Sequence, residues 1–226
     1  PHIGGGGVEK NFFIISNFLA KKISHVSVIT INKEFKNKLH KNINIISPVT
    51  SRWKNSSIYI KYFISLIILL KTLLKDKNYL VLSFQANWYA IIICKLISLK
   101  IISRSNTAPE GWSKNPLKRF LYKIIINLSD EVIVNSLEFK TSLNNFFKVK
   151  SKCIYNPLNK SKILRLSKIK KKLNFFKGKK YFKIVNIGRF TDQKNQLLIL
   201  KSIKHLNKSF PIRVIIAGRG VNHDVL

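Results

Sequence analysis

The chain has 226 residues, of which 46% are hydrophobic and 11% aromatic, so it can build a core and does not have the composition of a disordered protein. Its formal charge is +33, from 42 Lys and Arg against 9 Asp and Glu, which suggests nucleic acid, an acidic membrane face or a phosphorylated substrate as a partner. Because the charge is spread along the whole chain, we attribute much of it to compositional bias rather than to one dedicated ligand.

The first half of the chain alternates between helices and strands. A glycine loop at 4–7 leads into the first helix, and apolar runs bounded by turn residues follow it. In chain order we expect a helix over 8–22, strands over 26–30 and 43–49, a helix over 57–75, a strand over 80–84, a helix over 87–99 and a strand over 100–105.

The same alternation continues to the middle of the chain. Pro116 suits the first position of a helix, and Ser136 suits the N-cap of the next one. Continuous apolar strands between helices predict an α/β fold with a parallel sheet. We expect a helix over 116–128, a strand over 131–135, a helix ending near 147 and a short strand over 152–155.

Asn156 and Pro157 end this alternation. We therefore predict a Rossmann-like N-terminal domain over 1–157 that lacks its first strand, a basic linker region over 158–180, and the truncated beginning of a second Rossmann-like domain over 181–226. The second domain is expected to contain a strand over 181–187, a helix over 195–206 and a strand over 212–217.

The segment KIVNIGRFTDQKN, residues 183–195, is the most informative stretch. An apolar strand runs into Gly188, which can turn the backbone sharply, and Asp192 can cap a helix that begins near 193–194. Arg189 and Lys194 would then lie beside a helix N-terminus, where backbone N–H groups and the helix dipole favour phosphate. The alternative is an ordinary strand-to-helix turn with solvated basic residues.

The glycine loop is a weaker signal. Gly6 and Gly7 precede a helix and would let a substrate approach the backbone closely, although a flexible terminal linker explains four glycines equally well. The loop lacks the GxGxxG spacing of a dinucleotide site, and no P-loop motif is present. Gly218 and Gly220 form a second glycine turn after a strand.

Several kinds of site are disfavoured. There is no DxD motif, the acidic residues do not cluster and the histidines show no ligand spacing, so we expect no metal. Cys94 and Cys153 form neither a CxxC pair nor a Cys/His cluster. Specific nucleic-acid binding is disfavoured as well. Lysines interrupt the longest apolar stretches, which favours buried helices over membrane spans but leaves peripheral attachment to an anionic membrane open.

Four stretches together resemble glycosyltransferase family 4, the group 1 glycosyltransferases of GT-B fold. GGGGVEKNFFIISNFLAKKISHVSVIT is similar to the family's glycine loop, first helix and second strand, and DEVIVNS to a strand that ends at a serine-capped helix. IYNPLN resembles the segment that leaves the first domain. IVNIGRFTDQKN, followed by IIAGRG, resembles the opening of the donor domain. The order and spacing of these stretches cover nearly the whole chain.

The resemblance implies a retaining, metal-independent transfer of a sugar from a nucleotide-sugar, without a cofactor, to a glycan or lipid-linked acceptor. Arg189 and Lys194 match the family's basic pair on the donor diphosphate, and Gly6 and Gly7 match the loop that faces the donor. The family's E-x7-E motif is absent, because the last glutamate is Glu138. The catalytic residues are therefore unknown, and residues 1–226 alone are expected to be nearly inactive.

The resemblance also implies a role in surface polysaccharide or lipopolysaccharide synthesis at the inner face of the cytoplasmic membrane. No histidine lies between His40 and His205, where the family often has one near the acceptor. Two alternatives stay open: a non-enzymatic basic protein that binds anionic membranes or polyanions, and another GT-B enzyme such as a sugar-nucleotide epimerase. Candidate acceptor contacts, with a polar loop as the alternative, are Arg104, Ser105, Asn106, Glu110 and Trp112.

Overall fold

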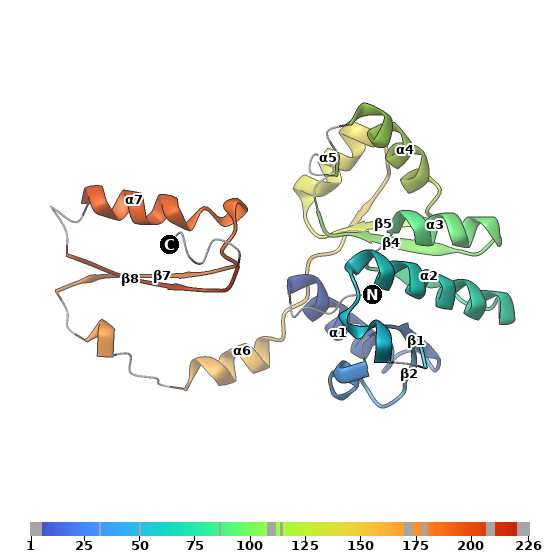
Figure 1. Cartoon of the computed structure of the whole chain (residues 1–226), viewed down its shortest axis with the longest axis horizontal. Coiled ribbons are helices and arrows are strands. Elements are labelled where there is room, and N and C mark those ends of the chain that lie inside the picture. Colours follow the sequence, from blue (N-terminus) through green and yellow to red (C-terminus); the bar gives the residue numbers. More distant parts are fainter. Residues whose placement is uncertain are drawn as a thin grey trace. The chain divides into compact units, whose positions relative to one another are not determined.

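The computed structural model divides the chain into two compact units, Pro1–Asn159 and Lys160–Leu226, which we call unit 1 and unit 2 (Figure 1). The structure describes residues 6–31, 33–49, 51–85, 87–107, 112–113, 115–169, 174–177, 180–206 and 211–220.

Unit 1 contains two parallel sheets. In the smaller sheet, β1 (Val26–Ile29) pairs with β2 (Ile43–Ile46), and Val26 lies opposite Ile43. The larger sheet has the order β3-β4-β5-β6, and each strand pairs in parallel with the next. Parallel pairing was predicted, whereas the division into two sheets was not. The four strands are β3 (Val81–Ser83), β4 (Ile101–Ser105), β5 (Glu131–Val134) and β6 (Lys152–Cys153).

Side-chain caps begin three of the unit 1 helices. The hydroxyl oxygen of Ser57 accepts the N–H of Ile60, and Asn115 Oδ1 accepts the N–H of Lys118. Ser136 Oγ accepts the N–H of Phe139, which confirms the predicted cap. The helices are α1 (Gly7–Leu19), α2 (Ile58–Lys75), α3 (Asn87–Leu96), α4 (Pro116–Asn127) and α5 (Leu137–Phe147), with 3-10 turns η1 (Lys33–Lys38) and η2 (Ser51–Asn55).

The core of unit 1 lies between the larger sheet and its helices. An aromatic group packs against it: Trp88 stacks on Tyr122 with ring centroids 4.3 Å apart, and Trp112 stacks on Phe147 at 5.3 Å. Burial also raises the pKa of the Cys94 thiol to about 11, so this cysteine is an inert core residue. The fully buried apolar side chains include Leu73, Ile91, Ile101, Ile126, Val134 and Leu143.

Asp130 links α3 to the start of β4. Its carboxylate accepts Lys95 Nζ and the N–H of Ile101, each at 2.7 Å. The hydrogen bond from Lys95, followed by the one from the Ile101 backbone, outweighs desolvation and lowers the pKa of Asp130 below its ordinary value of 3.8. Because the pKa is lower in the folded chain, this stabilisation is complete above pH 3.8 and is lost as the pH falls through the lowered value.

We expect Asp130→Asn to lower the free energy of unfolding of unit 1 at neutral pH by about 1 kcal/mol, since a partly exposed pair is weakened by solvent. The difference from the wild type should shrink in strong acid. Chemical denaturation at neutral pH and near pH 3 measures both. Glu131→Gln is the control, because its pair with Lys152 is more exposed and should matter less. An equal loss at both pH values would contradict the assignment.

Unit 2 is built on two parallel strands, β7 (Phe182–Ile187) and β8 (Ile212–Ala217), with Phe182 opposite Ile212. Arg213 on β8 donates from Nη1 to the carbonyls of Phe175 and Lys177, and its guanidinium lies 3.7 Å from the ring centroid of Tyr181. These contacts fix the chain that leads into β7. The other elements are α6 (Lys160–Ser167), η4 (Asn174–Phe176), η5 (Asp192–Lys194) and α7 (Gln196–Leu206).

Candidate functional site

The loops that follow β7 and β8 lie against each other. The N–H of Gly188 donates to the carbonyl of Ala217, and the N–H of Phe190 donates to that of Arg219, both at 3.0 Å. The Phe190 side chain is buried beneath the loops. Two successive backbone bonds of this kind hold the carboxyl edge of the β7–β8 sheet rigid, and Arg189 stands between them.

Gly218 and Gly220 make this close approach possible. A Cβ added at Gly218 would overlap the Gly188 carbonyl oxygen and lie 2.8 Å from the Phe190 ring. A Cβ added at Gly220 would overlap the carbonyl oxygen of Phe190. Both positions therefore require glycine because the backbone of the neighbouring loop occupies the space of a side chain. The predicted second glycine turn is thus part of the same loop pair as Arg189.

The structure places Lys194 over the loop that carries Arg189. A Cβ added at Gly188 would lie 3.7 Å from Lys194 Cγ, so the aliphatic part of the lysine covers this glycine. The side chains of Arg189 and Lys194 are both exposed. Two cations therefore lie beside one rigid backbone turn, where an anionic group could reach them.

Sequence reasoning missed Gln196, which positions this loop. The side chain is buried, and Nε2 donates to the carbonyl oxygen of Arg189 at 2.9 Å. A glutamine in the first turn of a helix after a basic loop gives only a weak signal. The amide of Gln196 thus holds the backbone of Arg189 in place, while the side chain of Arg189 is exposed.

One detail of the predicted turn was wrong. Asp192 does not cap a helix beginning near 193–194: it opens the 3-10 turn η5, and α7 begins at Gln196. Asn195, between η5 and α7, has the left-handed conformation, with φ 44°. Asparagine tolerates this conformation better than most residues, so Asn195 can end η5 and change the direction of the backbone before α7 begins.

Gly6 and Gly7 begin α1 in unit 1. Gly6 is the N-cap and provides no side-chain hydrogen bond, while a Cβ added at Gly7 would contact nothing within 4 Å. The Glu9 carboxylate lies near Gly6, with Oε2 2.8 Å from the position of an added Cβ. The start of α1 therefore has open space beside Gly7, whereas the Glu9 carboxylate lies beside Gly6. These glycines belong to unit 1, whereas Arg189 and Lys194 belong to unit 2.

Arg104 is deeply buried at the carboxyl end of β4, with 2% of its surface exposed. Its Nη2 donates to the carbonyl of Ile154 at 3.1 Å and to Asn156 Oδ1 at 3.0 Å, while Nε has no partner among the described residues. Burial lowers the pKa of the Arg104 guanidinium because it disfavours the charged form. Arg104 thus ties β4 to the segment that leaves unit 1.

The other predicted acceptor contacts lie around Arg104. Ser105 Oγ donates to the carbonyl of Thr107 at 3.0 Å, and Asn106 Nδ2 donates to that of Phe84 at 3.1 Å. Trp112 Nε1 also donates to Thr107, at 3.1 Å to Oγ1, while its indole packs in the aromatic group. Glu110 lies outside the described residues. The structure therefore brings Arg104, Ser105 and Asn106 together at one sheet edge.

Neither a metal centre nor a membrane span is found in the part of the chain that the structure describes. No three His, Cys, Asp or Glu side chains there are grouped so that they could bind one metal ion. The described helices are all too short or too polar to cross a bilayer. In α2, the longest of them, Lys61, Lys71 and Lys75 interrupt the apolar sequence.

Comparison with known sequences gives two glycosyltransferase relatives. An uncharacterized glycosyltransferase of Methanocaldococcus jannaschii is 33% identical over 106 residues, which cover 44% of this chain and 26% of that protein. A Campylobacter jejuni enzyme is 27% identical over 229 residues, which cover 96% of this chain and 59% of the relative. Its name describes an α-1,4-N-acetyl-D-galactosaminyltransferase acting on a GalNAc-containing diNAcBac-PP-undecaprenol. No family model matches. The chain spans less than two thirds of either relative.

Comparison with solved structures identifies the architecture. Anabaena HepE in complex with UDP and glucose superposes with a TM-score of 0.60 at 17% identity, over 97% of this chain and 60% of that one. A transferase from Siraitia grosvenorii in complex with UDP gives a TM-score of 0.51 at 11% identity, over 96% of this chain and 63% of its own. The fold is GT-B. This confirms the predicted fold class.

Proposed function

We propose that the protein containing this chain transfers a sugar from a nucleotide-sugar to a glycan or a lipid-linked acceptor. The observation that carries the proposal is the exposed pair Arg189 and Lys194 on the loop that Gly218, Gly220 and Gln196 hold in place. The structural relatives contain UDP, and the Campylobacter relative is named for a polyprenyl-diphosphate-linked acceptor. Both ligands carry a diphosphate.

The chemistry requires cations at this position because a nucleoside diphosphate leaves as the sugar is transferred. Negative charge develops on the diphosphate oxygens, and fixed cations in a water-poor cleft stabilise it. Each charge-assisted hydrogen bond contributes about 1.5–3 kcal/mol. Arg189 and Lys194 would supply this stabilisation without a metal. The retaining course and the metal independence of the reaction are part of the proposal.

The proposed setting is the inner face of a cytoplasmic membrane, in the synthesis of a surface polysaccharide or lipopolysaccharide. Support comes from the polyprenyl-linked acceptor named for the Campylobacter relative and from the net charge of +33. Anionic lipids attract a protein of this charge. Since the chain spans about 59% of that relative, we expect residues 1–226 alone to show no measurable turnover.

Arg189→Ala should weaken the binding of UDP to the chain about 10- to 100-fold, the equivalent of one charge-assisted hydrogen bond. Ligand-detected NMR titration measures this at several salt concentrations. Arg165→Ala is the matched control, because it removes an exposed arginine from α6 of the same unit. Equal losses for the two variants would contradict the proposed site.

Measuring UDP binding at several salt concentrations distinguishes a nucleotide-sugar site from a basic protein that binds any polyanion. A purely electrostatic binder loses affinity steeply with salt for every polyanion and does not distinguish UDP from other nucleotides. A nucleotide-sugar site keeps a preference among nucleotides in moderate salt. If the chain shows no such preference, and its affinities for heparin and for UDP fall equally as the salt concentration rises, it is a basic binding protein instead.

A further inference from the structure

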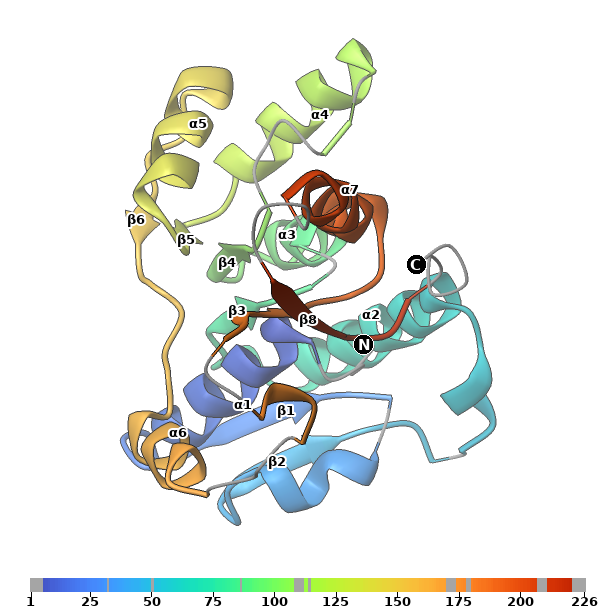
Figure 2. The ribbon, with the colours of Figure 1, turned by 90° about the vertical axis from the view of Figure 1, so that its left-hand side faces the viewer.

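Three neighbouring helices of unit 1 carry a second apolar face. Helix α3 packs against both α2 and α4, and Figure 2 shows the three along the same side of the larger sheet. Leu73, Ile91 and Ile126 point from these helices into the core, where each is at most 2% exposed. One apolar stripe per helix is enough to bury a helix on a sheet. These helices have more than one.

The additional apolar side chains are exposed at helical spacing. On α4, Leu117, Leu121 and Ile124 recur every three or four residues on the side opposite to the buried Ile126, and the C-cap Leu128 continues the spacing. We call the whole set the outer apolar face. It consists of Tyr59, Phe63, Ile67, Leu70 and Leu74 on α2, Tyr89, Ile92 and Leu96 on α3, Leu117, Phe120, Leu121 and Ile124 on α4, and Leu128 at the C-cap of α4.

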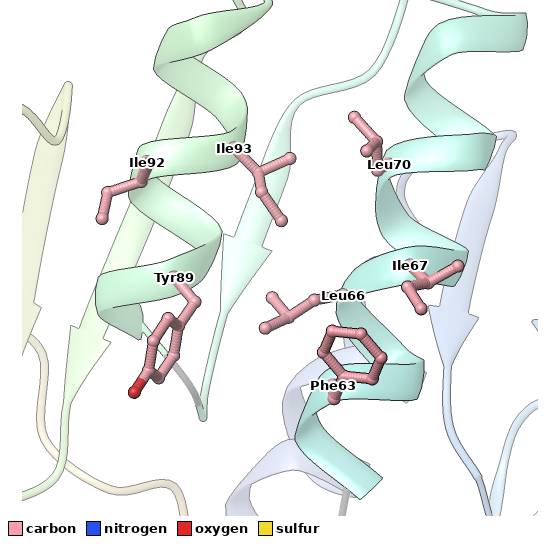
Figure 3. Close-up of a pocket in the computed structure, with 7 residues that line it drawn as sticks. All are labelled: Phe63, Leu66, Ile67, Leu70, Tyr89, Ile92 and Ile93. Atoms are coloured by element: carbon pink, nitrogen blue, oxygen red, sulfur yellow. The ribbon is translucent and has the colours of Figure 1, made fainter. Parts of the chain in front are cut away.

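An open groove between α2 and α3 lies within this face. Its volume is about 300 Å³. In Figure 3, Leu66 extends from α2 toward α3 and Ile93 extends from α3 toward α2, while Phe63 and Tyr89 line the same groove. The groove walls are almost entirely apolar. Single exposed apolar side chains are normal on a protein surface, whereas a group of this size is typical of an interaction site.

The charges around the face select the kind of partner. Helices α2, α3 and α4 contain no Asp or Glu. They contain seven basic residues: Lys61, Lys71, Lys75, Lys95, Lys118, Arg119 and Lys123. Lys95 alone among them is in a salt bridge that the structure describes, with Asp130. The partner must therefore accept both apolar side chains and an excess of positive charge.

We propose that the outer apolar face binds the surface of a bilayer that contains anionic lipids, with α2, α3 and α4 lying in its plane. Leu, Ile, Phe and Tyr side chains would enter the acyl boundary, while the lysines reach the phosphate groups. A second copy of the chain would bring cationic faces together. Nucleic acid would satisfy the lysines but leave the apolar side chains in water.

This inference rests on the membrane setting of the proposed function and names the surface that would make the contact. It does not depend on sugar transfer, because no residue of unit 2 takes part. Its test also needs no nucleotide. If the vesicle experiment fails while UDP binding by Arg189 succeeds, the membrane setting and this surface are wrong, and the transfer proposal stands. If the opposite occurs, the membrane surface stands and the transfer proposal falls.

The experiment is flotation of the full chain with vesicles in a density gradient, which separates bound protein from aggregates. Vesicles of phosphatidylcholine alone are compared with vesicles that also contain phosphatidylglycerol. We expect the chain to float with the anionic vesicles, to float less with neutral ones, and to be partly released by salt.

Two variants test the two components of the face. Leu121→Ser with Ile124→Ser, both at exposed positions of α4, should lower the partition coefficient at least about 10-fold. Lys118→Glu with Lys123→Glu should lower it at least about 10-fold on anionic vesicles only. Leu137→Ser, at an exposed position of α5, is the control and should float like the wild type. Circular dichroism confirms that each variant is folded.

Three results would overturn the proposal. The wild type could stay at the bottom of the gradient with both kinds of vesicle. Both double variants could float as the control does. Finally, sedimentation equilibrium could show a dimer that anionic vesicles do not dissociate and that the serine variants abolish, in which case the face is an interface between copies of the chain.

Discussion

Replacing Gly218 with alanine is expected to destroy the loop pair at the carboxyl edge of β7 and β8. The added methyl group would overlap the carbonyl oxygen of Gly188, a backbone atom that cannot rotate away. The two loops would have to separate, which would break the bond from Gly188 N–H to the Ala217 carbonyl and uncover Phe190. We expect unit 2 to lose roughly 4 kcal/mol or more of stability, since overpacking is combined with lost hydrogen bonds.

Gly188→Ala is the matched control within the same loop pair. There the methyl group would meet Gln196 Nε2 at 3.5 Å and Lys194 Cγ at 3.7 Å, which are ordinary contacts with side chains. We expect only a small change in stability for this variant. Hydrogen exchange of the β7 and β8 amides reports the difference. Protection that survives Gly218→Ala would show that the loops can separate without unfolding the sheet.

Replacing Arg104 with alanine should cost unit 1 about 3 kcal/mol. The change leaves the carbonyl of Ile154 and Asn156 Oδ1 without their donor and opens a cavity at the carboxyl end of β4. Chemical denaturation measures the loss. Arg52→Ala is the control, because this arginine is exposed in the same unit and should change stability by less than about 0.5 kcal/mol.

Arg104→Met separates packing from hydrogen bonding. Methionine fills much of the volume but donates no hydrogen bond and carries no charge, so burial no longer penalises it. If the hydrogen bonds to Ile154 and Asn156 stabilise the unit, Arg104→Met remains clearly less stable than the wild type. A variant as stable as the wild type would show that Arg104 is retained for another reason, such as contact with an acceptor.

The order of strands and helices could be read from the sequence because each element has its own apolar pattern and turn chemistry. Ser136 and Pro116 begin the helices that they were predicted to begin. The predicted range 195–206 differs from α7 by one residue at its start, but the motif alone placed that start too early, near 193–194. A short polar run such as 192–195 can form a 3-10 turn or a first α-helical turn at similar cost. Only tertiary contacts, such as the bond from Gln196 to the Arg189 carbonyl, decide between them.

The candidate site was predictable only in part. The neighbourhood of Arg189 and Lys194 follows from one local motif, whereas the contact with Gly218 and Gly220 joins segments about 30 residues apart. Arg104 was marked as a candidate for acceptor contact by the family resemblance, and only the structure shows that its guanidinium donates to Ile154 and Asn156. The acceptor role of Arg104 and its neighbours stays a prediction.

The bonds of Arg104 also affect how unit 1 can form during synthesis. Its partners lie about 50 residues later in the chain, at the very end of the unit. While the ribosome holds Ile154 and Asn156, strands β3, β4 and β5 carry the Arg104 cation without these acceptors. Burying Arg104 before its acceptors are available is unfavourable, so we expect complete packing only after β6 and the segment that follows it have emerged. Unit 1 would then reach its final order just as unit 2 begins to appear.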